Sequence, residues 1–300
     1  MCRLPLPLIA CILFLTAGTA PAQETEDRLD FELSLFPMRF DNFFQAPDGA
    51  PQEDVDAGRV EARIAYRLLP DRPLALTAEA GYTAYGQGLD DSPSAGIGLE
   101  SQGRPHEWAL GATFRVDQPV FDVGDELEQA DTLALAGDYG YRLGDDWELH
   151  ALGEWTHQSF EIIDRKNNDL WGLGGAVRYR GWGYGFSPEI GFMTGERDVD
   201  DPTEDHDQQD VWLKIRSIPV DPLYLSLRYR VRNRDYQTDD PLASNFGRED
   251  DRDQWTLAAD YRLTPRWAVN LYVDYLDAES TKESRTFDTT LFGLGLTWDL

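Results

Sequence analysis

From Arg59 to the C-terminus the chain repeats one unit, a run of about ten residues in which apolar and polar side chains alternate. A short connection rich in proline or glycine follows, then a second alternating run, then a longer acidic connection. Residues with a period of two point to opposite faces of a strand, so each run predicts a β-strand with one apolar and one polar face. Regular alternation of short and long connections favours an antiparallel barrel whose apolar face contacts lipid.

The pattern predicts fourteen strands, with a range of 12 to 16, because the alternation is weaker in residues 29–36, 95–99 and 184–194. In residues 59–68, for example, Val60 and Ile64 share one face while Arg59 and Arg63 share the other. Proline and glycine end strands for steric reasons. They predict six tight turns, at 69–73, 102–105, 144–146, 180–183, 218–222 and 264–266.

A soluble β-sandwich is the alternative fold for such alternating strands. It would bury the apolar faces between two sheets and its aromatic residues in mid-strand, without alternation of short and long connections. Here aromatic residues stand near strand ends on the apolar face, as Trp147, Trp267 and Trp298 do, with Tyr82 and Trp155 towards the other rim. Indole and phenol rings prefer the headgroup zone of a membrane, so the barrel is favoured.

The N-terminus differs from the rest of the chain. Arg3, an apolar run over 4–17 and Ala20-Pro21-Ala22 predict a cleaved signal peptide over residues 1–22. The run is shorter than the ~20 residues of a membrane-spanning helix, and a lipoprotein site at Cys11 is a second alternative. Cys2 and Cys11 are the only cysteines, so the mature chain would have no disulfide and no cysteine metal site. Residues 23–300 are predicted to form one domain.

With these features the chain resembles a Gram-negative outer-membrane β-barrel. The C-terminal segment is similar to the signal read by the barrel-assembly machinery; it consists of Gly293, Leu296, Trp298 and Leu300, although the last position is usually aromatic. In length and strand number the chain is similar to small monomeric porins of the outer membrane protein G type. The resemblance implies an outer-membrane location, contact with lipid and lipopolysaccharide, assembly by that machinery and a monomer. The resemblance is to a broad class of proteins, and the sequence contains no motif that assigns the chain to a named family within that class.

The net charge of −28 makes nucleic acid an unsuitable partner. Most of the excess negative charge lies in the longer connections, and residues 196–207 are the densest segment. These connections are predicted at 41–56, 86–93, 117–129, 160–168, 196–209, 236–252 and 277–285. These acids could bind divalent cations that bridge to lipopolysaccharide, attract cations to the pore mouth, or keep the connections soluble. The third interpretation is the simplest, because no segment has the spaced glycine and terminal glutamate of a calcium-binding EF-hand loop.

A fourteen-strand barrel should enclose water, so residues of the polar face are pore-lining candidates. Cations predominate among them, on the strand that begins at Arg59 and on two later, adjacent strands. The candidates are Arg59, Arg63, Arg67, Lys214, Arg216, Arg228, Arg230, Arg232, Arg262, Glu79 and Asp260. We call the first eight, from Arg59 to Arg232, the basic ladder. It either guides anionic solutes, which it would concentrate without holding tightly, or pairs with wall carboxylates to keep the barrel rigid.

The leading functional hypothesis is passive passage of small hydrophilic solutes, with anions as one candidate class, and without a cofactor. The alternative is a conduit or partner in exopolysaccharide export or surface assembly. A remote alternative is a lipid esterase, because His157 and Ser159 share the apolar face near a rim, where Asp169 or Asn168 could orient the imidazole. However, the residues after Ser159 differ from those of outer-membrane phospholipases. The other histidines are too dispersed to suggest a metal site.

Overall fold

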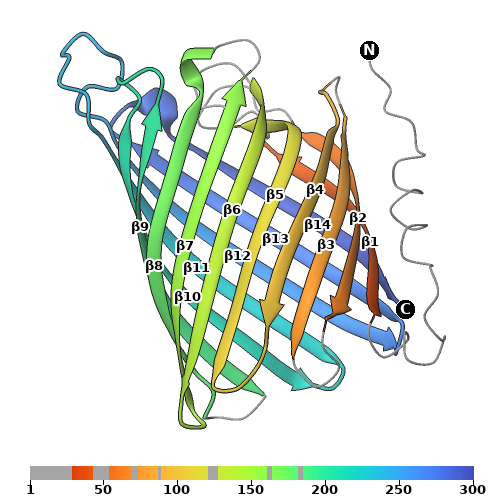
Figure 1. Ribbon diagram of the computed structural model, residues 1–300. Coiled ribbons are helices and arrows are strands. Elements are labelled where there is room, and N and C mark those ends of the chain that lie inside the picture. The colour runs from red at the N-terminus through yellow and green to blue at the C-terminus, as the bar shows by residue number, and fades with distance from the viewer. Residues whose placement is uncertain are drawn as a thin grey trace.

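In the computed structural model, fourteen antiparallel strands form one closed barrel (Figure 1). The structure describes residues 29–42, 54–68, 73–86, 89–120, 128–160, 164–181 and 185–300. Each strand pairs with its neighbours in sequence, and β1 closes the ring by pairing with β14. This confirms the predicted all-β, up-and-down barrel and the strand number.

The strands are between ten and sixteen residues long. Their bounds are β1 Leu29–Asp41, β2 Val55–Arg67, β3 Leu74–Tyr85, β4 Ser92–Ser101, β5 His106–Val120, β6 Glu128–Leu143, β7 Trp147–Phe160, β8 Asn168–Tyr179, β9 Phe186–Val199, β10 His206–Val220, β11 Leu223–Tyr236, β12 Glu249–Thr264, β13 Trp267–Ser280 and β14 Phe287–Asp299. Two single-turn 3₁₀ helices, η1 Asp164–Lys166 and η2 Glu283–Arg285, lie in the long connections.

The six predicted turns all fall between strands that end at the same end of the barrel, where the C-terminus also lies (Figure 1). Residues 69–72 and 182–183 of two of these turns lie outside the described residues. In the turn after β6, Gly144 has a φ of 67°, which glycine adopts without steric cost. The predicted long connections were too wide, because β9, β10, β11 and β12 continue into residues 196–209 and 236–252. The cause is continued backbone pairing: His206 is still opposite Arg197, and Asp235 opposite Glu249.

The predicted signal peptide, residues 1–22, lies outside the described residues. Among the residues that the structure describes, no helix is long and apolar enough to cross a membrane.

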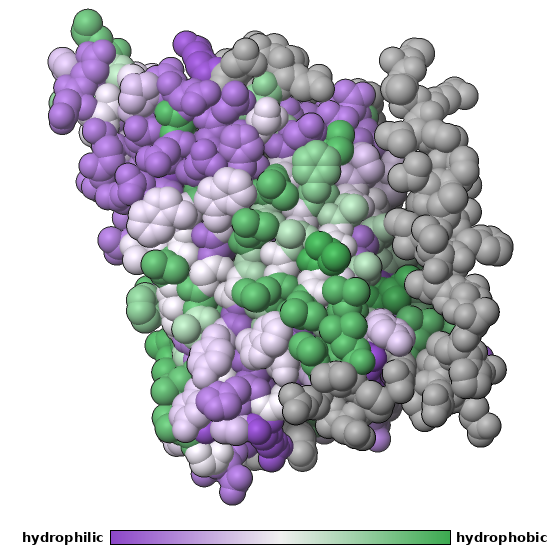
Figure 2. Space-filling model, in the orientation of Figure 1, coloured by the Kyte–Doolittle hydropathy of each residue, from purple (hydrophilic) through white to green (hydrophobic). Residues whose placement is uncertain are grey.

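The outer face of the barrel is apolar, whereas many of its buried side chains are polar. Outward residues such as Leu173, Phe192 and Leu294 are about half exposed or more. Figure 2 shows apolar side chains gathered across the middle of the visible wall, with hydrophilic side chains above them. Among the described residues, the side chains most deeply buried include Arg234, Glu148 and Asp210. This inverted distribution is expected where hydrocarbon lies outside the wall and polar groups fill the inside.

Two aromatic girdles bound the apolar band. Towards the short turns, Trp147 contacts Tyr179, and Trp267 contacts Trp298. Towards the long connections, Tyr229 stacks on Trp255 with ring centroids 4.4 Å apart. Trp155 and Trp171 are opposite each other at that second level, as are Trp255 and Tyr275. Trp147 and Trp155, like Trp267 and Tyr275, are eight residues apart. That spacing is roughly 26 Å along a strand, or about 20 Å across a membrane after strand tilt.

Above the second girdle the outward residues change from apolar to acidic. Asp207 lies between Glu196 and Asp235, and Asp253 lies opposite Asp277. Like charges that face each other across strands repel, so this arrangement is tolerated only where water and ions screen it. We call these outward carboxylates the acidic rim. It places the long connections and the ends of β9–β13 outside the hydrocarbon layer.

Candidate functional site

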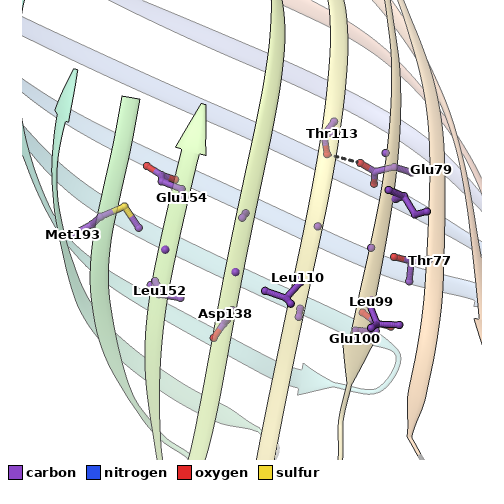
Figure 3. Close-up of a pocket in the computed structure, with 18 residues that line it drawn as sticks. Thr77, Glu79, Leu99, Glu100, Leu110, Thr113, Asp138, Leu152, Glu154 and Met193 are labelled. Atoms are coloured by element: carbon purple, nitrogen blue, oxygen red, sulfur yellow. Dashed lines mark hydrogen bonds between the residues drawn. The ribbon is translucent and has the colours of Figure 1, made fainter. Parts of the chain in front are cut away.

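The lumen is the candidate functional site, and part of its wall is lined by small residues. On β3–β9, inward positions such as Gly96, Gly111 and Ala136 help to line a cavity of about 360 Å³ (Figure 3). Glycine and alanine keep this wall thin, which leaves space for water inside the barrel. Carboxylates project from the same wall; Figure 3 shows Glu79 receiving a hydrogen bond from Thr113 across 3.1 Å. Nearby, His150 lies 2.8 Å from Asp138.

The basic ladder is divided between two sides of the barrel. Arg59, Arg63 and Arg67 occupy inward positions of β2, whereas the other five members lie on β10 and β11, about half-way around the ring. All three arginines of β2 have a carboxylate partner. Arg59 pairs with Glu61, Arg63 with Glu100 at 3.4 Å, and Arg67 with Asp30 at 3.9 Å. Alternation in the sequence does not predict these pairs, because it assigns a side chain to a face but not to a partner.

On β10 and β11 the ladder is only partly neutralised. Asp210 pairs with Arg230 and lies 2.8 Å from Arg232, and Arg216 lies 3.5 Å from Glu189. Lys214 and Arg228 are directly opposite each other in the register, yet neither makes an ion pair with the residues that the structure describes. The Arg228 guanidinium lies 5.2 Å from the centre of the Trp212 ring. A methyl group on Gly191 would overlap that indole ring, so this glycine leaves room for the stack.

The two remaining pore-lining candidates lie on β12. Arg262 is 3.8 Å from Asp299, and Asp260 accepts a hydrogen bond from Asn270. Asp260 also lines a second cavity, described below. All eleven candidates thus occupy inward positions, and most of them are paired.

At the end with the long connections, polar groups fill the lumen beside β8–β12. Arg248 is paired with Asp250 at 2.6 Å, and its guanidinium lies 4.3 Å from the Tyr236 ring. Neighbouring connections bind each other: Asn245 donates to the carbonyl of Thr203. Hydrogen bonds from Thr203 lower the pKa of Asp201, whereas burial raises the pKa of Glu204. The connections β9–β10 and β11–β12 are therefore joined to each other by a direct hydrogen bond.

At the end with the short turns, a buried carboxylate is surrounded by cations. The Glu148 side chain has no exposed surface and lies 2.8 Å from Arg178, 3.5 Å from Arg142 and 3.7 Å from Arg180. Arg178 also binds Glu189 across 2.7 Å. Several arginines near this carboxylate line a cavity of about 630 Å³, which we call the vestibule.

Four vestibule arginines were missing from the pore-lining prediction, namely Arg104, Arg142, Arg178 and Arg180. Arg178 precedes Tyr179 and Arg142 follows Tyr141, both on the apolar face, so strict alternation would have placed these two inside. Arg104 and Arg180 lie in or beside turns, where alternation no longer applies.

The proposed esterase residues are only partly assembled. His157 Nδ1 lies 3.1 Å from Asp169 Oδ1, and the His157 ring stacks on Trp155. No hydrogen bond joins Ser159 to His157 among the described residues. Because the serine is not bonded to a base, we expect purified protein to release no fatty acid from phospholipid or lipid A in detergent. Ester release that disappears in Ser159→Ala would contradict this expectation.

The predicted assembly segment forms the strand that closes the barrel. Leu296 and Trp298 point outwards opposite Leu35 and Leu33, and the Leu300 amide donates to the carbonyl of Phe31. Gly293 lies opposite Met38 on the inner side. Within the described residues, no three His, Cys, Asp or Glu side chains converge as a metal site.

Two solved structures share this architecture at low identity. OmpT, an outer membrane protein of Vibrio cholerae, is 11% identical with a TM-score of 0.51, covering 91% of this chain and 97% of that one. A mutant of the TodX monoaromatic hydrocarbon channel is also 11% identical, with a TM-score of 0.51 and coverage of 93% and 90%. At this identity the likeness concerns the fold. No curated protein matches the sequence.

The sequence itself matches the family model of Gram-negative porins over residues 123–281, which is more than half of the chain. This region contains all eight strands from β6 to β13, including the partly neutralised section of the ladder and much of the vestibule. The closed barrel has an apolar outer band and a charged interior, which agrees with this match. The chain therefore belongs to the Gram-negative porin family.

Proposed function

We propose that this porin passes small hydrophilic solutes passively and favours anions over cations. Its family makes it a channel of the Gram-negative outer membrane, surrounded by lipid. The preference for anions is supported by Lys214 and Arg228, which face each other on neighbouring strands without an ion pair among the described residues. Two uncompensated cations on one wall attract a passing anion and repel a cation.

Ion selectivity in planar bilayers tests this proposal. We expect the double substitution of Lys214→Gln and Arg228→Gln to lower the anion-to-cation permeability ratio roughly fivefold, since charges about 4 Å apart interact by about 1 kcal/mol in water. A second double substitution, Arg228→Ala with Arg230→Ala, should also lower the anion-to-cation permeability ratio. An unchanged reversal potential in both would mean that the ladder only stabilises the wall.

A neutral pair provides the matched control. Arg63 and Glu100 form an ion pair on the lumen wall, so Arg63→Gln with Glu100→Gln removes one charge of each sign. This variant should keep the permeability ratio of the unchanged protein. A wild-type barrel that inserts but conducts no current would instead favour the export or assembly role.

The remaining features of the proposal concern the maturation and state of the chain. Residues 1–22 would be removed as a signal peptide, and residues 23–300 would form one domain. The C-terminal strand would be read by the barrel-assembly machinery. Lipopolysaccharide would contact the outer wall of the barrel at the end with the long connections. The closed ring needs no partner strand, which supports a monomer. The proposal assigns the chain no enzymatic activity.

A further inference from the structure

The vestibule lies at the turn end of the lumen and draws its cations from several strands. Arg142 comes from the end of β6, Arg178 and Arg180 from the end of β8 and the residue after it, and Arg216 from β10. Arg104 comes from the turn between β4 and β5. The charged residues that line the cavity are therefore these five arginines together with Asp145 and Asp260.

The lining arginines are of two kinds. Arg142 and Arg178 are held in place by carboxylates behind them, because Glu107, Glu148 and Glu189 bind their guanidinium groups. The side chains of Arg180 and Arg216 are more than one third exposed. Their ion pairs are longer, because Arg180 lies 3.7 Å from Glu148 and Arg216 lies 3.5 Å from Glu189. Arg104 makes no ion pair within the described part of the chain and is exposed. Three guanidinium groups thus retain free N–H donors.

The other polar lining groups suit the same kind of ligand. The Tyr224 side chain is 43% exposed and lines the cavity, next to the hydroxyl of Ser226. Asp260, which accepts a hydrogen bond from Asn270, and Asp145 are the two acidic lining residues, so five guanidinium groups face two carboxylates. Donors therefore predominate on the accessible wall.

We infer that the vestibule is a binding site for a solute with two or more separated oxyanion groups, such as a di- or tricarboxylate or a phosphorylated sugar. A guanidinium fork binds one carboxylate or phosphate through two parallel hydrogen bonds. Several arginines from different strands therefore match more than one oxyanion group. A volume of about 630 Å³ is within the range of small-ligand sites.

This inference deepens the proposed function, on which it rests for the route by which the solute arrives. The two can fail separately, because the vestibule is distinct from Lys214 and Arg228. Binding is measured on the intact, detergent-folded barrel and needs no current, whereas selectivity is measured in bilayers.

Isothermal titration with citrate, succinate and acetate tests the site. We expect citrate to bind most tightly and acetate least, because each added carboxylate can engage another guanidinium. Arg180→Gln and Arg216→Gln should each weaken citrate binding about tenfold, as expected for the loss of a charge-assisted hydrogen bond. Arg104→Gln should weaken it by a smaller factor, and since Arg104 has no ion pair, this variant carries little risk of misfolding.

Arg115→Gln is the matched control, because it removes one inward cation of β5 that does not line the vestibule. It should change citrate affinity by less than about twofold, the scale of a screened, distant charge. Equal binding of citrate and acetate would overturn the inference. So would citrate binding that withstands the Arg104, Arg180 and Arg216 substitutions but weakens in Arg228→Ala, which would place the ion at Arg228 instead of in the vestibule.

Discussion

Replacing Leu294 with arginine is expected to destabilise the inserted barrel by about 2–4 kcal/mol, the range for a cation at the bilayer midplane. The Leu294 side chain is 50% exposed on the outer wall. It lies opposite Leu271, which is four residues from Trp267 and four from Tyr275, so it sits midway between the girdles. Urea unfolding in lipid vesicles would measure the change.

Depth provides the control for this substitution. Asn233 also points outwards, but it lies above Tyr229 and donates to Asp251 in the acidic rim. Asn233→Arg should therefore cost less than about 1 kcal/mol, or even stabilise the rim by adding a cation among carboxylates. Equal destabilisation by both substitutions would contradict a lipid-facing band between the girdles.

The second large effect is expected at the buried carboxylate beneath the vestibule. Glu148→Gln should destabilise the barrel by about 3 kcal/mol, since removing one member of a buried ionic cluster leaves the others uncompensated. Three arginines lie within 3.7 Å of this side chain, and their mutual repulsion would no longer be balanced. The unfolding midpoint in denaturant, with gel migration of unheated samples as a folding check, would report the loss.

Glu61→Gln is the matched comparison on the same inner face. Glu61 pairs with Arg59, but both side chains are about 40% exposed. An exposed pair contributes about 1 kcal/mol or less, so this variant should unfold near the wild-type midpoint. If the two glutamate variants unfolded together, Glu148 would not be the centre that holds the arginines in place.

The barrel could be predicted from sequence because its outer face obeys one simple rule. Alternation identified outward residues such as Val60, Leu213 and Trp298, and proline or glycine identified the turns. The rule weakens above the membrane, where water is present on both sides of the wall. Residues such as Asp207 and Asp251 were therefore assigned to connections, although their backbones still pair in the sheet.

The interior was less predictable, because alternation gives the face of a residue but not its partner. Arg59 and Arg228 have the same pattern in the sequence, yet one is paired with a carboxylate and the other lies over an indole ring. Which cations remain uncompensated depends on register and strand order, and these follow from closure of the whole ring. The vestibule combines residues from the β4–β5 turn to β12, a separation that no local pattern encodes.

The short distance between the second girdle and the acidic rim limits how the protein can move along the membrane normal. Asp253 and Asp277 are two residues beyond Trp255 and Tyr275, which is roughly 7 Å along a strand. Sinking by more than that amount would carry both carboxylates past the headgroup level of the girdle and into hydrocarbon, at a cost of several kcal/mol for each ionised group. The protein is thereby held at one immersion depth, which keeps both openings of its channel in water.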